Sequence, residues 1–302
     1  MKVIIFAGAG MLGRAIAQEL RSHGHSVATA GRSGCDVQVD FRYALHPDEF
    51  TPIVRGADIV INAVGILIER GDAFFDQVHV TAPQALFEAC AKEHVARVVQ
   101  ISALGAGRIT KGRYIASKEA AERALATAMQ HASGDWAVVR PSFLMQAGSP
   151  ATDLFLRLAR LPVHCTPGLT RTSEPMLAPM QCEDAAQAIC RICEHPKALR
   201  RAIEMAGPEE LRYSEFLAQL RASLGLRPAF KLRLPWWLIH LTARLAEHLP
   251  QKVLSADGVR ILRAGLTTTQ NEALYWLRSM PKPAVAGIEF AQSATELIAT
   301  TE

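Results

Sequence analysis

The fold of this chain is decided by residues 2–14, which read KVIIFAGAGMLGR. Residues 3–6 form an apolar run that predicts a strand buried on both faces. Three glycines follow at the spacing Gly-x-Gly-x-x-Gly, and a helical pattern begins directly after them. Such glycines let backbone N–H groups approach a phosphate closely, and the positive end of the helix attracts the anion. The stretch therefore predicts a dinucleotide-binding loop between the first strand and the first helix.

This loop supplies the first candidate cofactor-binding residues, which are Gly8, Ala9, Gly10, Met11, Leu12 and Gly13. The same stretch fits the longer pattern Gly-x-x-Gly-x-x-Gly if Ala7 stands in place of its first glycine. Its place after a strand and before a helix strengthens the motif. The alternative is a tight turn without a ligand.

Short apolar runs alternate with helical patterns through the first half of the chain. Strands are expected at residues 2–7, 25–30, 37–39, 58–64, 97–101 and 136–139, and helices at 11–22, 76–94 and 112–131. This β–α–β rhythm predicts parallel strands joined by right-handed crossovers. We therefore expect an α/β protein with a Rossmann doubly wound parallel sheet.

The pattern changes after residue 142, where prolines gather and the periodicity becomes irregular. A helix at 184–194 and a strand at 202–206 are expected to return to the Rossmann lobe. We expect residues 1–142 plus about 181–206 to form this cofactor-binding lobe. Residues of about 143–180 and 207–302 would form a smaller, mostly helical C-terminal substrate lobe, with amphipathic helices at 213–224 and 235–249.

Composition excludes several classes of protein. The 302 residues carry a net charge of +4 without a dense basic run, so nucleic acid is not an expected partner. Every apolar run falls short of the roughly 18–20 residues that a spanning helix needs. The chain opens directly with a strand, so we expect a cytoplasmic protein with reduced thiols. Cys190 and Cys193 lie in a helical pattern, where core packing is favoured over redox or metal chemistry, and no metal is expected.

The residues after the second strand bear on the choice of cofactor. An NAD enzyme usually places a carboxylate there, whereas this chain has Gly31, Arg32 and Ser33. A guanidinium can bind a 2′-phosphate with two hydrogen bonds, so we expect NADP(H) to be preferred over NAD(H). The alternative for Arg32 is a solvated loop residue. Asp40 is placed either to accept a hydrogen bond from the adenine amino group or to cap a turn.

The ends of the later strands supply the remaining candidate cofactor-binding residues. The fourth strand closes on small residues where the nicotinamide-side ribose is expected to pass. These candidates are Asn62, Ala63, Val64, Gly65, Ile101 and Pro141.

Three residues form a candidate catalytic group, namely Ser102, Tyr114 and Lys118. Ser102 ends the fifth strand, and positions 114 and 118 share one face of the next helix. A phenol is a poor acid–base catalyst at neutral pH unless a nearby ammonium lowers its pKa. Lys118 would do this and also hold the nicotinamide ribose, while Ser102 would polarise a carbonyl or hydroxyl oxygen. The alternative is an ordinary exposed helix face.

With these motifs the chain resembles the short-chain dehydrogenase/reductase superfamily. It is most similar to the atypical branch that contains the NADPH-binding accessory subunit of respiratory complex I and its bacterial relatives. The stretches that carry the resemblance are residues 7–14, 78–83, 98–106, 114–118, 136–142, 180–186 and 206–209. The resemblance implies a Rossmann lobe, a bound NADP(H) and, in many relatives, an active site on Ser102, Tyr114 and Lys118.

Two departures from the family pattern are Ala7 in place of the first glycine and His79 where many relatives carry Asn. Gly8 could compensate for the first. His79 could act as a proton relay. A helix residue whose ring is hydrogen-bonded to a backbone carbonyl is the favoured interpretation.

Three functional hypotheses follow. The first is an NADP(H)-dependent oxidoreductase or epimerase-like enzyme that acts on a carbonyl or hydroxyl of a small-molecule substrate. The second is a non-catalytic NADPH-binding module, because several members of the branch keep the nucleotide as a structural element. The third, weaker hypothesis is peripheral membrane contact through Trp236 and Trp237, because core packing of their helix into the second lobe is favoured. The substrate and the oligomeric state stay open.

Overall fold

The computed structural model describes residues 1–109, 112–246 and 256–277. The chain divides into two compact units. Among the described residues, the first contains Met1–Pro141, Cys182–Met205 and residues 270–277, and the second contains Ser142–Gln181 and those of Ala206–Thr269. Residues 270–277 therefore belong to the first unit, although the sequence analysis placed them in the substrate lobe. A salt bridge explains their place: an oxygen of Glu272 lies 2.5 Å from a guanidinium nitrogen of Arg201.

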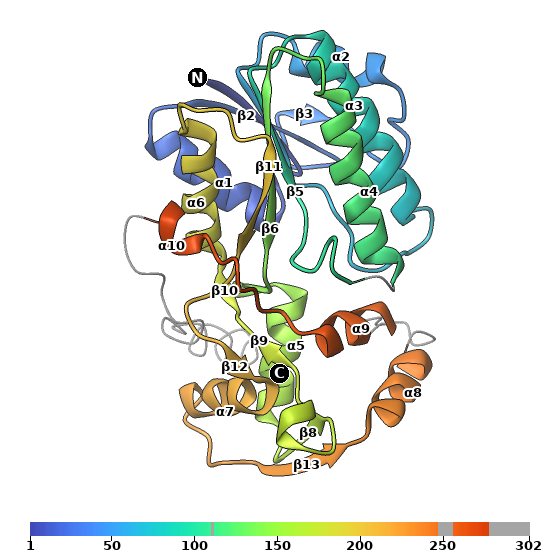
Figure 1. Ribbon diagram of the computed structural model, residues 1–302, viewed down its shortest axis with the longest axis vertical. Helices are drawn as coiled ribbons and strands as arrows, with labels where there is room; N and C mark the ends of the chain where they lie inside the picture. The colour runs from blue at the N-terminus through green and yellow to red at the C-terminus, as the bar shows by residue number, and fades with distance from the viewer. Residues whose placement is uncertain (110–111, 247–255, 278–302) are drawn as a thin grey trace, which may run out of the picture. The chain divides into compact units, whose positions relative to one another are not determined.

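The first unit is built on one seven-stranded sheet with the order β11-β6-β5-β4-β1-β2-β3, in which every pair is parallel (Figure 1). Its strands are β1 (Lys2–Phe6), β2 (Ser26–Gly31), β3 (Val37–Gln38), β4 (Ile59–Asn62), β5 (Arg97–Ile101), β6 (Asp135–Pro141) and β11 (Arg201–Met205). The order reverses beside β1, as a doubly wound sheet requires. The expected Rossmann fold is confirmed.

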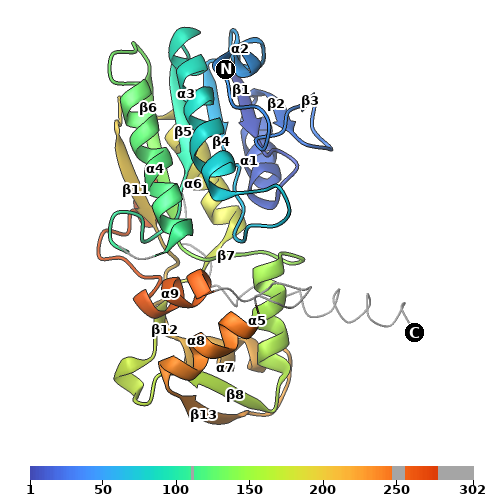
Figure 2. The same ribbon diagram turned by 90° about the vertical axis from the view of Figure 1, so that its right-hand side faces the viewer.

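Helices cover both faces of this sheet (Figures 1 and 2). On one face lie α1 (Met11–Ser22), α6 (Cys182–Glu194) and the short α10 (Ala273–Trp276). On the other lie α2 (Pro47–Val54), α3 (Ala82–Lys92) and α4 (Arg113–Ala128). In α1 the buried side chains of Ile16 and Leu20 are one turn apart, and the chain turns at Gly24 with a φ of +79°. The apolar stripe and the glycine stop explain why the helix has the predicted limits.

Aromatic packing fills the space between the sheet and α2. The ring centroids of Phe6 and Phe50 are 5.8 Å apart, and those of Phe41 and Phe50 are 5.3 Å apart in an edge arrangement. Phe6 and Phe50 are fully buried. Each such ring contributes its buried apolar area and a favourable ring–ring geometry. Helix α2 was not expected from the sequence, because its helical pattern is short and contains Pro52.

The helix expected at 76–94 is confirmed in part, because its first stretch, Asp76–Thr81, is π-helical and α3 follows it. Such wide turns occur often at functional sites. Here the π-helical stretch carries His79, which is buried.

The second unit has small sheets and helices around its own core. Its elements are β7 (Leu144–Met145), α5 (Pro150–Arg160), β8 (Val163–Pro167), η2 (Arg171–Ser173), β9 (Met176–Leu177), β10 (Met180–Gln181), β12 (Leu211–Arg212), α7 (Tyr213–Ser223), β13 (Phe230–Leu234), α8 (Trp236–Ala246) and α9 (Ala256–Ala264). An aromatic cluster joins α5 to α7, with the rings of Phe155 and Phe216 5.2 Å apart. Proline-rich connections separate these short elements, which explains the irregular pattern of the sequence.

Helix α8 differs from the expected packing. Trp237, Leu241 and Leu245 are 67%, 46% and 62% exposed, so core packing is wrong for these side chains. It holds in part for the other face of the helix, where Ala243 is fully buried and Leu238 is half-buried. The expected end of the helix, residues 247–249, lies outside the described residues. Among the residues that the structure describes, every helix is too short or too polar to cross a bilayer.

Candidate functional site

The glycine-rich loop joins β1 to α1 and brings the backbone close to the start of the helix. The amide of Gly10 donates to the carbonyl of Ala7 at 2.9 Å. A Cβ on Gly13 would stand 2.2 Å from the same carbonyl oxygen, so only glycine fits there. Gly10 is the N-cap of α1 and supplies no side-chain cap. Because the first N–H groups of a helix have no intrahelical acceptor, this end of α1 fits an anion such as a pyrophosphate.

Ala7 adopts the backbone conformation that its replaced glycine would adopt. Its φ is +60°, in the left-handed region where a Cβ costs roughly 1–2 kcal/mol. Its amide donates to the carbonyl of Ala30 at 2.8 Å, which ties the turn to β2. Compensation by Gly8 stays a prediction, while Ala7 itself takes a left-handed conformation in this loop.

The carboxyl end of β4 is held by amide side chains. Asn62 faces Gln100 across the strand pair, and its Nδ2 donates to Gln100 Oε1 at 2.8 Å. The Oδ1 of Asn62 accepts from the amide of Val64 at 3.1 Å. Asn62 is fully buried, so its side chain shapes the turn at residues 63–65 from below.

Lys118 lies beside this turn. Its Nζ is 3.4 Å from the carbonyl oxygen of Val64, in the turn after β4, and 3.3 Å from that of Ile101, which ends β5. A Cβ on Gly65 would stand only 3.0 Å from the same nitrogen. Lys118 is 5% exposed, and this burial lowers the pKa of its ammonium to about 8, although the carboxylate of Glu122 acts in the opposite direction.

Tyr114 precedes Lys118 by one helical turn on α4. Its ring packs edge-on against Phe75 at 5.9 Å and against His79 at 5.7 Å. Burial raises the pKa of the Tyr114 phenol to about 12. This direction is opposite to the expectation that Lys118 lowers the pKa of Tyr114, because desolvation of the phenol raises it.

Ser102 belongs to a buried network that the sequence analysis missed. Its hydroxyl donates to Glu122 Oε1 at 2.5 Å. Arg140 donates to the two oxygens of the same carboxylate at 3.0 and 2.5 Å, and it also lies 3.4 Å from an oxygen of Glu204. These carboxylates raise the pKa of Arg140. The available signal was the four-residue spacing of Tyr114, Lys118 and Glu122 on one helix.

His79 is held in one protonation state by its neighbours. Its Nε2 accepts from the amide of Ile66 at 2.9 Å, and its Nδ1 lies 2.8 Å from Ser117 Oγ, which itself donates to the carbonyl of Tyr114. Burial, with the charge of Lys118, lowers the pKa of His79 to about 2. The ring is therefore neutral with its proton on Nδ1, and its partners are an amide and a hydroxyl rather than the expected carbonyl.

The edge of the sheet after β2 carries the residues expected near the adenosine. Arg32 is exposed in the loop between β2 and β3. Asp36, in the same loop, accepts from the amide and the hydroxyl of Thr29, both at 2.8 Å. Asp40 caps a turn by accepting from the amide of Arg42 at 3.0 Å, and the Arg42 guanidinium lowers the pKa of this carboxyl. The turn-capping alternative for Asp40 is what the structure shows.

The structure thus brings most of the predicted residues to one edge of the sheet. The loop of residues 8–13, the turn at 62–65, Ile101 and Lys118 all lie at or beside the carboxyl ends of β1, β4 and β5. The carbonyl of Pro141 accepts from the amide of Leu104 at 2.9 Å at the end of β6. Open parallel sheets bind their ligands at this edge.

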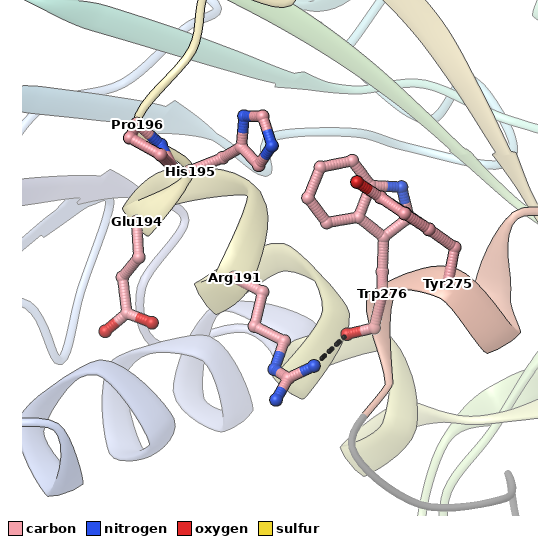
Figure 3. Close-up of a pocket in the computed structure, with 6 residues that line it drawn as sticks. All are labelled: Arg191, Glu194, His195, Pro196, Tyr275 and Trp276. Carbon is pink, nitrogen blue, oxygen red and sulfur yellow. Dashed lines mark hydrogen bonds between the residues drawn. The ribbon is translucent and has the colours of Figure 1, made fainter.

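A shallow groove lies elsewhere in the first unit, at the C-terminal end of α6 (Figure 3). It is lined by Arg191, Glu194, His195, Pro196, Tyr275 and Trp276. Arg191 reaches the carbonyl of Trp276 at 3.5 Å, and the rings of His195 and Trp276 meet edge-on at 5.3 Å. These contacts attach α10 to α6, so the groove belongs to the packing of the returning segment.

Comparison with known proteins agrees with this geometry. The sequence profile of a family described as NAD(P)H-binding matches residues 8–162. The chain therefore belongs to this NAD(P)H-binding family. The match begins in the glycine-rich loop and includes Tyr114 and Lys118.

Two curated relatives resemble about two thirds of this chain. A ceramide reductase of Caulobacter vibrioides is 28% identical over 63% of this chain and 57% of its own length. Subunit 9 of the NADH dehydrogenase [ubiquinone] 1 alpha subcomplex of Rattus norvegicus, a mitochondrial protein, is 22% identical over 68% of this chain and 56% of its own length. The chain thus spans little more than half the length of these relatives. The likeness to the complex I subunit is confirmed.

Solved structures share the fold over almost the whole chain. The human epimerase family protein SDR39U1 with NADPH has a TM-score of 0.72 at 17% identity, covering 97% of this chain and 99% of its own. The protein MoeE5 in complex with UDP-glucose and NAD has a TM-score of 0.71 at 17% identity, covering 98% and 100%. Fold relatives therefore include one with NADPH and one with NAD.

Proposed function

We propose that this protein is an NADP(H)-dependent oxidoreductase or epimerase-like enzyme that acts on a carbonyl or hydroxyl carbon. The observation that carries the proposal is the place of Lys118. Its buried ammonium lies within 3.4 Å of the carbonyl oxygens of Val64 and Ile101. Lys118 follows Tyr114 by one helical turn and lies at the same edge of the sheet as the glycine-rich loop. Burial of a cation whose hydrogen bonds are this long disfavours its charged form. A lysine with such a lowered pKa is typical of a ligand-binding site.

Each residue of the site has its own role in this proposal. The bound nicotinamide supplies or accepts the hydride. The N–H groups at the start of α1 would hold the pyrophosphate, and Lys118 would donate a hydrogen bond to the nicotinamide-side ribose. With its ammonium fixed there, Lys118 favours the phenolate of Tyr114 and moves that pKa down from about 12. Tyr114 donates a proton to the substrate oxygen during reduction and removes it during oxidation.

Ser102 has a different role in this proposal from the one expected of a substrate orienter. Its proton is engaged by Glu122, which also receives Arg140. Ser102 therefore acts as a positioning residue that holds the end of β5 against α4. Glu122 in turn favours the charged form of Lys118.

The choice of NADP(H) is supported by the loop after β2. Asp36 is the acidic residue of this loop, and its carboxylate is turned onto Thr29 rather than toward the strand end. Arg32 is exposed and close enough to Asp40 to lower the pKa of that carboxyl. A 2′-phosphate would therefore meet a guanidinium there.

The Arg32→Ala change tests this preference. We expect NADPH affinity to fall about 10- to 100-fold, because a charge-assisted bidentate contact is lost, while NADH affinity stays the same. Titration calorimetry with both nucleotides measures this, and Arg123→Ala, on the exposed face of α4, is the control. Equal losses for NADH and NADPH would overturn the assignment to the phosphate.

For the substrate we propose a long-chain lipid that carries a carbonyl or hydroxyl carbon. The relative from Caulobacter is named a ceramide reductase. In the second unit, β13 and α8 expose large apolar side chains, with Phe230 at 70% and Trp237 at 67%. An apolar surface of this kind fits acyl chains better than it fits a sugar.

The decisive experiment follows NADPH oxidation with a ceramide whose secondary hydroxyl has been oxidised to a ketone, in mixed micelles. Tyr114→Phe is expected to lower turnover by about 10²- to 10⁴-fold, because general acid catalysis is lost, and to leave the NADPH affinity within about threefold. Tyr275→Phe, an exposed tyrosine of α10, is the matched control. Unchanged turnover in Tyr114→Phe would refute the catalytic role.

A second candidate function is a non-catalytic NAD(P)H-binding module. The raised pKa of Tyr114 and the engagement of Ser102 by Glu122 favour it, because neither group is poised for proton transfer without a ligand. Under this hypothesis the nucleotide stabilises the fold by mass action. Wild-type protein would then bind NADPH and gain thermal stability, yet it would oxidise no NADPH with any carbonyl substrate.

A further inference from the structure

Four side chains with metal-binding atoms meet at the other end of α1, far from the glycine-rich loop. His23 caps the C-terminal end of α1, and His25 immediately precedes β2. Cys190 and Glu194 lie one turn apart on α6, which packs beside α1. A helix of 12 residues places this group ~18 Å from the loop at the start of α1.

The distances bring these atoms into one small shell. His23 Nδ1 is 2.8 Å from Glu194 Oε1 and 3.5 Å from Cys190 Sγ. The three ligand atoms of His23, Cys190 and Glu194 all lie within 4.8 Å of one another. His25 Nε2 is 2.9 Å from the same oxygen of Glu194. Bonds of about 2.0–2.3 Å to a tetrahedral ion separate neighbouring donors by about 3.3–3.7 Å. His23, Cys190 and Glu194 lie near this spacing, whereas His25 stands outside this group of three and needs a larger side-chain rotation to complete the shell.

A fifth residue, Glu19, contacts His23 in the way that a carboxylate usually contacts a metal-binding histidine. The Nε2 of His23, on the far side of the ring from Glu194 and Cys190, lies 3.4 Å from Glu19 Oε1. A ligating imidazole almost always donates its other N–H to a carboxylate or a carbonyl. Glu19 is one helical turn before His23, so α1 itself supplies this contact.

Burial and charge indicate which ion fits. Cys190 is fully buried, while the side chains of His25 and Glu194 are 11% and 29% exposed, so an ion could enter from one side. A thiolate, a carboxylate and two neutral imidazoles carry two negative charges, which a divalent ion balances. Mixed sulfur, nitrogen and oxygen donors at tetrahedral spacing are typical of Zn²⁺.

We propose that His23, His25, Cys190 and Glu194 form a structural zinc site that joins α1 and the start of β2 to α6. Binding replaces the thiol proton of Cys190 with the ion and releases that proton to solvent. The four protein ligands fill a tetrahedral shell, so the site stabilises the first unit rather than activating water. Cys193, the other cysteine of the pair, takes no part, because it is buried beside Arg97.

Metal titration of the purified, chelator-treated protein tests this proposal. We expect one Zn²⁺ per chain with an apparent Kd below about 1 µM, measured by competition with a chromophoric chelator. Co²⁺ in the same site is expected to show visible bands of tetrahedral geometry and a near-ultraviolet thiolate charge-transfer band. Zn²⁺ should also raise the Tm of the wild-type protein by several degrees without changing its NADPH affinity.

Variants assign the ligands. Cys190→Ser is expected to lose the charge-transfer band and at least 100-fold in Zn²⁺ affinity, and Glu19→Gln to lose about 10- to 100-fold. Cys193→Ser and the exposed Cys165→Ser are the controls and should bind as the wild type does. Where Cys190→Ser fails to fold, His25→Gln replaces it, and the wild-type Co²⁺ spectrum stands by itself.

Substoichiometric Zn²⁺, a Co²⁺ spectrum without the thiolate band, or wild-type affinity in Cys190→Ser would each overturn the proposal. The four groups would then be a metal-free cluster in which Glu194 accepts hydrogen bonds from both histidines.

Discussion

Two buried cations lie at opposite ends of β5, and their surroundings differ. Arg97, at its start, donates to Asp135 at 2.9 Å and to the carbonyls of Ile192, Cys193 and Lys197 at 2.6, 3.0 and 2.9 Å. Lys118, at its end, has carbonyl contacts of 3.3 and 3.4 Å. Both residues are less than 9% exposed.

The difference distinguishes a cation with a structural role from one with a functional role at the two ends of β5. Arg97 caps the C-terminal end of α6 and pairs with a carboxylate, so its charge is compensated within the fold. Lys118 is desolvated with weaker compensation, which lowers its pKa to about 8. A protein keeps such a group where a ligand later supplies the missing contacts.

The largest expected effect comes from Lys118→Met. Turnover is expected to fall about 10²- to 10⁴-fold because the partner of Tyr114 is lost, while the free energy of unfolding at pH 7 rises by about 1–3 kcal/mol because a buried charge is removed. The exposed Lys92→Met is the control. A loss of stability in Lys118→Met would show that the ammonium is well compensated.

The same variant changes the pH dependence of stability. The unfolded lysine holds its proton up to about pH 10.5, whereas the folded one releases it near pH 8. The unfolded state therefore binds more protons between these values, and wild-type stability gains a contribution that rises with pH through this window. Urea unfolding at several pH values should show this rise in the wild type and its absence in Lys118→Met.

Arg97→Met probes the other end of the strand. It leaves Asp135 buried without its guanidinium partner, so we expect a loss of about 3–5 kcal/mol in the free energy of unfolding. Arg123→Met breaks an exposed pair with Glu119 and should cost less than about 0.5 kcal/mol. Chemical denaturation measures both. Similar losses for the two arginines would contradict the compensated role of Arg97.

The smallest expected effect is that of Ala7→Gly in the cofactor loop. Glycine relieves the positive φ but adds freedom to the unfolded chain, so we expect a net gain of about 0.5–1 kcal/mol. NADPH affinity should change less than threefold. Ala9→Gly, two residues later, is expected to lower stability instead, and a thermal melt of both variants distinguishes the two outcomes.

Local patterns predicted most of the Rossmann sheet. The helix at Met11–Ser22 and the strand at Arg97–Ile101 have the limits expected from the sequence. Both have a strong period or a continuous apolar run with a clear stop. Helix α2 was missed because it is short and contains a proline, and the π-helical stretch at Asp76–Thr81 follows from packing around His79.

The cofactor loop was found from its spacing, but the electrostatics of the site were not. The network of Ser102, Glu122 and Arg140 joins β5, α4 and β6. The pKa of Tyr114 is raised, opposite to the expectation, because the phenol is desolvated by burial, which the sequence does not show.

By itself the sequence determined the tight glycine-rich turn between the first strand and the first helix, and predicted an anion site there, because glycine spacing and helix polarity are local properties. It also placed Tyr114 and Lys118 on one helix face. Only the tertiary structure decided how deeply these groups are buried and which distant charges meet. It brought His23 to Cys190 across 167 positions of the chain, because the packing of α1 against α6 depends on the whole sheet.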